Sequence, residues 1–108
     1  MAITLSLPPE LTIYTVPDLR SAWLQFLEQL DTQAPGEAPE DDRIALDASR
    51  IDDLDGAGVQ LLLSLARSLR ERQRRLVLVQ PSEIAGRACR CLGVDRILLD
   101  EPVGEAPV

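Results

Sequence analysis

The sequence contains no histidine and no lysine. Without histidine the chain lacks the commonest general base and the commonest metal ligand, which excludes Ser-His-Asp and Cys-His catalytic arrangements. Its only cysteines, Cys89 and Cys91, stand two residues apart in a predicted helix. Their side chains would point about 200° apart, so one disulfide or one metal ion could hardly use both. We interpret them as small apolar residues.

Charge and apolar patterning narrow the class of protein further. No stretch has the apolar length of a membrane span, and the first ten residues lack the pattern of a signal peptide, so we expect a cytoplasmic protein without membrane insertion. The net charge of −7 and the pI near 4.4 argue against a nucleic-acid or anionic-membrane partner. With 108 residues, 45% apolar and 27% charged, the chain fits one ordinary folded domain.

The most informative segment runs from Ile44 to Leu69. It reads as a short apolar strand, a turn rich in carboxylates and glycine, and a strongly apolar helix. Unpaired N–H groups at a helix start often bind phosphate. Here Asp52, Asp53 and Asp55 crowd that start and would repel an anion. The turn is better suited to displaying a surface than to holding a nucleotide.

The rest of the chain alternates strands with helices. Residue patterns predict strands at 3–7, 11–14, 75–79 and 96–99, and helices from Thr15 to about residue 30 and over 82–92. Trp23 and Phe26 fall on the apolar stripe of the first helix, as core residues. Helices between strands imply parallel pairing with right-handed crossovers. We therefore predict an α/β domain over residues 1–100, with a four- to five-stranded mixed sheet and three to four packed helices.

Two segments have the composition of irregular structure. Residues 31–42 are rich in proline, glycine and acid and are predicted to form a flexible loop. Residues 101–108 are predicted to be a frayed tail.

Other interpretations of the acidic turn and the arginines stay open with weaker support. Gly56-Ala57-Gly58 lacks the third glycine and the lysine of a phosphate loop. A divalent cation could bind to carboxylates in and near the turn. Their spacing differs from that of a calcium-binding loop; they are Asp47, Asp52, Asp53 and Asp55. A run of arginines could bind an acidic partner, although such a run is more typical of a solvated helix end. Its members are Arg67, Arg70, Arg72, Arg74 and Arg75.

The segment IALDASRIDDLDGAGVQLLLSLARSL resembles the centre of the STAS domain family, the anti-sigma factor antagonists and their relatives. In that family a strand ending in Leu-Asp leads to Asp-[Ser/Thr]-[Ser/Ala]-Gly-[Leu/Val] at the next helix. Leu46-Asp47 matches the strand end, and Asp55 and Ala57–Val59 match the turn. The segments LSLPPELTIYTVPDLRSAWLQFL and LVLVQPSEIAGRACRCLGVDRIL resemble the family's opening and closing parts. The resemblance thus covers nearly the whole chain.

One position departs from the family pattern. The residue that a partner kinase phosphorylates in the family is the Ser or Thr directly after the motif Asp, and here that position is Gly56. Glycine has no hydroxyl, so the resemblance implies no phosphorylation at this position. In the family the unphosphorylated form binds the partner, which implies a constitutively competent chain.

Helix geometry indicates where a partner would dock. Gly58, Leu62, Leu65 and Leu69 point one way at 100° per residue, and Val59 and Leu63 fall at the edge of that apolar arc. We expect these two side chains to be exposed, although another helix could equally cover them. The predicted partner-binding residues are Asp52, Asp53, Asp55, Gly56, Ala57, Gly58, Val59, Gln60 and Leu63.

The resemblance implies a non-catalytic module that binds a regulatory protein and carries no metal or cofactor. Three settings fit: an antagonist of an anti-sigma factor kinase, a small subunit bound to the ATPase of a lipid-transport ABC complex, or a module of a chemotaxis-type signalling cluster. A homodimer also stays open. The alternative of another class is a metal-dependent enzyme that uses the aspartate turn.

Overall fold

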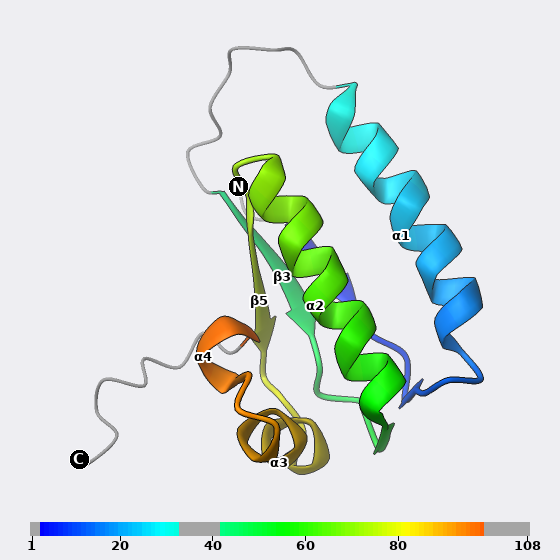
Figure 1. The fold of residues 1–108 in the computed structure, drawn as a ribbon, viewed down its shortest axis with the longest axis vertical. Coiled ribbons are helices and arrows are strands. Elements are labelled where there is room, and N and C mark those ends of the chain that lie inside the picture. The colour runs from blue at the N-terminus through cyan, green and yellow to red at the C-terminus, as the bar shows by residue number, and fades with distance from the viewer. Residues whose placement is uncertain (1–2, 33–41, 99–108) are drawn as a thin grey trace.

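Strands and helices alternate along the chain (Figure 1). The computed structural model describes residues 3–32 and 42–98. Its strands are β1 (Ile3–Ser6), β2 (Glu10–Leu11), β3 (Arg43–Asp47), β4 (Asp53–Leu54) and β5 (Arg75–Val79). Its helices are α1 (Val16–Asp31), α2 (Gly56–Glu71), α3 (Glu83–Cys91) and α4 (Asp95–Leu98). This order confirms the predicted α/β class.

The main sheet has three parallel strands in the order β1-β3-β5. Its register aligns Leu5 with Leu46 and Leu46 with Leu78, so that apolar residues form a continuous row across the sheet. Leu46 and Leu78 are almost completely buried. Strands β2 and β4 form a separate parallel pair. The main sheet therefore has fewer strands than expected, and the pairings in the described residues are parallel, not mixed.

Helix α2 packs on the sheet, and α1 packs chiefly against α2 (Figure 1). Leu62 and Leu69 of α2 are fully buried, because they repeat at the spacing that keeps one helix face toward the strands. Trp23 and Leu27 are the buried residues of α1, and Trp23 is a core residue as predicted. The first turns of α1 and α2 lie at the same end of the molecule (Figure 1).

The predicted strand at residues 96–99 is wrong. Residues Asp95–Leu98 form the short helix α4 instead. Gly93, with a φ of 72°, ends α3, and the Val94 N–H then donates to the carbonyl oxygen of Cys89. A helical turn brings Val94 and Leu98 next to each other, and both are buried, whereas a strand would place them on one face but about 13 Å apart.

One arginine of the run at the end of α2 has a structural role. Arg72 forms a two-pronged ion pair with Asp31, with Nε–Oδ1 at 2.7 Å and Nη2–Oδ2 at 3.0 Å. This pair ties the end of α2 to the end of α1. It lowers the pKa of the Asp31 carboxyl from its ordinary value, through the hydrogen bond from Arg72.

Parts of two predictions lie outside the described residues. Of the predicted loop at 31–42, Asp31 ends α1 and residues 33–41 are not described. The predicted tail at 101–108 is not described either. Across the described ranges, the helices are too short or too polar to cross a bilayer.

A close approach joins α2 to β2. Gly58, in the first turn of α2, is buried, and a Cβ atom there would overlap the carbonyl oxygen of Leu11. Leu11 is itself fully buried. Only glycine allows the helix to start this close to the β2 backbone.

We expect Gly58→Ala to lower the free energy of unfolding by about 1–3 kcal/mol, because the added methyl group forces the helix away from β2. Gly56→Ala is the matched control. Its Cβ meets no atom within 4 Å, so stability should change by no more than about 1 kcal/mol and should rise. Urea unfolding of the three proteins measures both effects. Equal stability of Gly58→Ala and the wild type would contradict the close approach.

Candidate functional site

Asp55 organises the start of α2. It is the N-cap residue, and its Oδ1 accepts a hydrogen bond from the Gly58 N–H at 3.0 Å. Its Oδ2 accepts from the Ile13 N–H, also at 3.0 Å, although Ile13 is 42 positions away in sequence. Hydrogen bonds from the N–H groups of Ile13 and Gly58 lower the pKa of the Asp55 carboxyl from its ordinary value. One ionised carboxylate therefore holds two segments together.

Backbone hydrogen bonds reinforce this junction. The N–H groups of Asp52 and Asp53 donate to the carbonyl oxygen of Pro9 at 2.8 and 3.2 Å. The Asp55 N–H donates to the Leu11 carbonyl oxygen at 3.3 Å. Because both segments are tied along their length, the loop before α1 and the turn before α2 form one surface. We call it the tip surface: Ile13, Tyr14, Asp52, Asp53, Gly56, Ala57 and Gln60.

The structure divides the predicted partner-binding residues into three groups by exposure. Exposed residues are Asp52, Asp53, Gly56 and Gln60; Ala57, Asp55 and Leu63 are half-buried. Gly58 and Val59 are buried, and the Val59 side chain is only 3% exposed. The expectation of an exposed Val59 was wrong, because Val59 is part of the same apolar core as Leu11 and Ile51. Leu63 packs at the edge of that core.

Sequence reasoning missed the most exposed apolar residues of this surface. Ile13 is 62% exposed and Tyr14 is 85% exposed. The chain was predicted to be a strand at 11–14, but β2 ends at Leu11 and a turn follows. The Thr15 N–H donates to the Thr12 carbonyl oxygen at 2.9 Å, and the Tyr14 N–H donates to the Thr12 hydroxyl at 3.3 Å. The two threonines were the available signal, since their hydroxyls stabilise turns.

The carboxylates near the turn have local hydrogen-bond partners or face solvent. The Asp47 Oδ1 accepts from the Ser49 N–H at 2.9 Å, which lowers the pKa of Asp47 from its ordinary value. Asp55 caps α2, while Asp52 and Asp53 are exposed. Within residues 3–32 and 42–98, no three His, Cys, Asp or Glu side chains gather where they could hold a metal ion.

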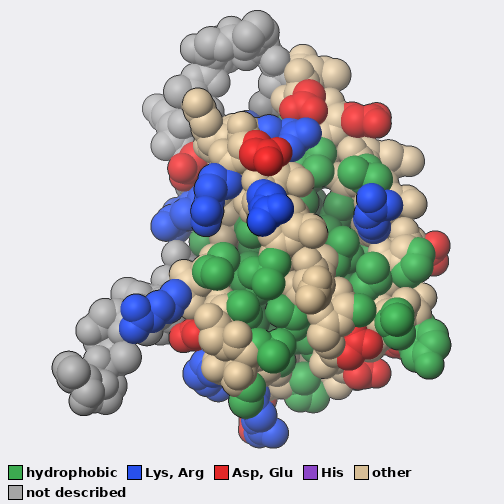
Figure 2. Space-filling view, in the orientation of Figure 1, with side chains coloured by type: hydrophobic (Ala, Val, Ile, Leu, Met, Phe, Trp, Pro, Cys, Tyr) green, Lys and Arg blue, Asp and Glu red, His purple; other side chains and the backbone are tan. Residues whose placement is uncertain are grey.

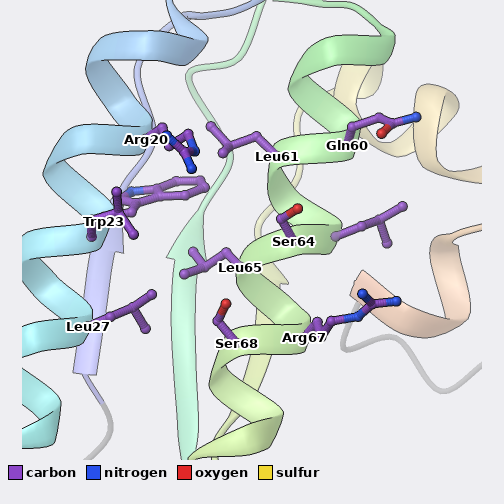
Figure 3. Close-up of a pocket in the computed structure, with 11 residues that line it drawn as sticks. Arg20, Trp23, Leu27, Gln60, Leu61, Ser64, Leu65, Arg67 and Ser68 are labelled. Atoms are coloured by element: carbon purple, nitrogen blue, oxygen red, sulfur yellow. The ribbon is translucent and has the colours of Figure 1, made fainter.

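A groove lies between α1 and α2, next to the tip surface (Figure 3). It has a volume of about 480 Å³. Trp23 and Leu27 from α1 and Leu61 and Leu65 from α2 point into it (Figure 3). A shallower extension, which includes Gly56, connects this groove with the tip surface.

The chain matches the family described as "Mlab, STAS domain" over residues 2–100. The protein belongs to the STAS domain family. This finding confirms the family predicted from the motif, and the match includes the Asp55–Val59 turn. Among curated proteins, none matches the chain.

Two solved structures have a similar fold. The protein TM1081, determined by NMR, superposes with a TM-score of 0.67 at 23% identity, over 97% of this chain and 78% of that one. The anti-sigma factor antagonist SpoIIAA in its unphosphorylated form superposes with a TM-score of 0.64 at 20% identity, over 97% of this chain and 84% of that one. At this level of identity the similarity establishes the fold.

We expect Asp55→Ala to lower the thermal unfolding midpoint at neutral pH, because two N–H groups lose their acceptor. Asp53→Ala is the control, since that side chain is exposed and does not cap the helix. Because folding lowers the pKa of Asp55, its charge stabilises the fold above the unfolded-state pKa. That contribution disappears as pH falls through the folded-state pKa.

The difference between wild type and Asp55→Ala should therefore shrink in acid. Circular dichroism melts at several pH values measure it. A difference that stays constant with pH would contradict the role of the ionised carboxylate.

Proposed function

We propose that this protein is a non-catalytic regulatory module of the anti-sigma factor antagonist type, which acts in the cytoplasm and binds a regulatory protein through its tip surface. The observation that carries the proposal is the exposed pair Ile13 and Tyr14 beside Gly56, fixed by Asp55. Its STAS family membership and its fold support the same class.

The tip surface has the properties of a protein-binding site. A tyrosine and an isoleucine exposed next to each other offer apolar surface that a partner can bury, and tyrosine is enriched among the residues that dominate binding energy. The loop is held in place before binding, since Asp55 accepts from the Ile13 N–H and Thr12 accepts from the Tyr14 N–H. The loop is therefore ordered before a partner arrives, and it loses little conformational entropy on binding.

Gly56 favours a partner contact that phosphorylation does not switch. It occupies the position of the family's phosphorylated Ser or Thr and carries no hydroxyl. A constitutive contact also suits the second candidate function, a small subunit bound permanently to the ATPase of an ABC complex. The tip surface serves both candidates. Identification of the partner, by affinity capture with the wild-type protein, distinguishes them.

We expect Tyr14→Ser to weaken partner binding by about tenfold or more, because it removes the largest exposed apolar side chain of the tip surface. The thermal midpoint should stay close to the wild-type value, since Tyr14 is 85% exposed. Ile97→Ser, at a 48% exposed site on α4, is the matched control and should bind normally. Titration calorimetry with the captured partner measures the affinities. Unchanged affinity of Tyr14→Ser would refute docking at the tip surface.

With an anti-sigma factor kinase and ATP, the wild-type turn at residues 52–59 should gain no phosphate. Gly56→Ser should gain one, because the new side chain enters open space and the backbone at position 56 is not left-handed. Ala57→Ser, at a half-buried neighbour, is the control. Intact mass spectrometry with peptide mapping detects the phosphate. Phosphate on the wild-type turn would contradict the unswitched contact.

A further inference from the structure

The flank of α1 that borders the groove carries a charge pattern that is complementary to itself. Arg20, Leu24 and Glu28 follow one another at intervals of four residues and lie on the same side of the helix, within about 80° of arc. Arg20 and Glu28 are exposed, and Leu24 is 46% exposed. The positive and negative groups are thus placed symmetrically about an exposed leucine.

Neither charge has a partner within the described residues. The ion pairs there join Arg72 to Asp31 and Arg87 to Glu83, and neither Arg20 nor Glu28 makes a side-chain hydrogen bond. The neighbours of Arg20 one turn away along α1 are Val16 and Leu24, which carry no charge. Both side chains are thus solvated and available for an ion pair with a group from outside the described part of the chain.

The groove beside this flank is also unusual in charge. None of its 11 lining residues is acidic, although the chain has a net charge of −7. Arg20 lies at its α1 side, above Trp23 (Figure 3). Apolar side chains gather on this face around α2 (Figure 2). An occupant that brings a carboxylate and an apolar side chain fits this edge.

We propose that α1 of a second copy of this chain packs antiparallel to α1 along this edge, with the two-fold axis passing between the two Leu24 side chains. Arg20 of each copy then faces Glu28 of the other, because each lies four residues from the centre in opposite directions. Leu24 of each copy covers the apolar edge of the groove beside its partner's Leu24. A two-fold interface requires this self-complementarity.

The interface involves one helix of 16 residues from each copy. Such a contact falls well below the roughly 1,200–2,000 Å² of stable interfaces, so the dimer is weak and forms at high protein concentration. Two exposed ion pairs contribute, so self-association should decline as salt screens them. Arg20 also lines the shallow extension of the groove with Gly56, Ala57 and Gln60, so the dimer interface borders the tip surface. The dimer is argued from the α1 flank alone, and this proposal does not depend on the proposed function.

Charge reversal tests the pairing. Sedimentation velocity over a concentration series into the millimolar range should show a monomer–dimer equilibrium for the wild type. Arg20→Glu and Glu28→Arg should each weaken dimerisation by about tenfold or more, because each creates two like-charged pairs at the two-fold interface. The double variant Arg20→Glu/Glu28→Arg restores both pairs and should return the dissociation constant to within about threefold of the wild type.

If only the net charge of the protein governed dimerisation, the two single variants would behave differently from each other. Arg20→Glu makes the protein more acidic and Glu28→Arg makes it less acidic, so a general charge effect would move their dissociation constants in opposite directions. Arg87→Glu, at an exposed site on α3 where Arg87 pairs with Glu83, is the charge-matched control and should dimerise as the wild type does. A wild type that is monomeric throughout, a double variant that fails to recover, or an equal loss in Arg87→Glu overturns the proposal.

Discussion

The junction between the start of α2 and strand β2 is the contact on which the arrangement of the site depends. Gly58 lets the helix backbone approach the Leu11 carbonyl oxygen, and Asp55 joins the same helix turn to the loop before α1. Removal of either feature would separate segments that lie more than 40 positions apart in sequence. The tip surface exists because these distant segments share one carboxylate.

The first turn of α2 contains both buried residues that stabilise the fold and exposed residues that a partner can contact. Gly58 and Val59 face the core, whereas Gly56 and Gln60 face solvent. A rotation of 100° per residue makes such neighbours point in different directions. Evolution can therefore change Gly56 or Gln60 without loss of the core, while Gly58 is fixed by packing. The absence of a hydroxyl at position 56 is not required by the fold, since space is free there.

Strands and helices with a clear apolar period were predicted correctly from the sequence. The predictions were wrong where local hydrogen bonds decide the structure or where the apolar run is short. Strand β5 matched its predicted range because a run of apolar residues is buried on it. The pair Ile13 and Tyr14 has high strand propensity, but the Thr12 and Thr15 side chains stabilise a turn. The run at 96–99 was too short for its period to be read. The exposure of Val59 was predicted wrongly because residues distant in sequence bury its side chain, and a helical projection does not include them.

The tip surface and the α1 flank come from different segments of the chain and adjoin each other at Arg20. The tip surface comes from the loop before α1 and from the start of α2, whereas the flank is centred on Leu24, in the middle of α1. In an antiparallel pair, the two helix starts lie at opposite ends. A dimer through α1 would therefore carry one tip surface toward each end of the helix pair. Self-association at high concentration would then bring two tip surfaces into one assembly, each bordered by the Arg20 of its own chain.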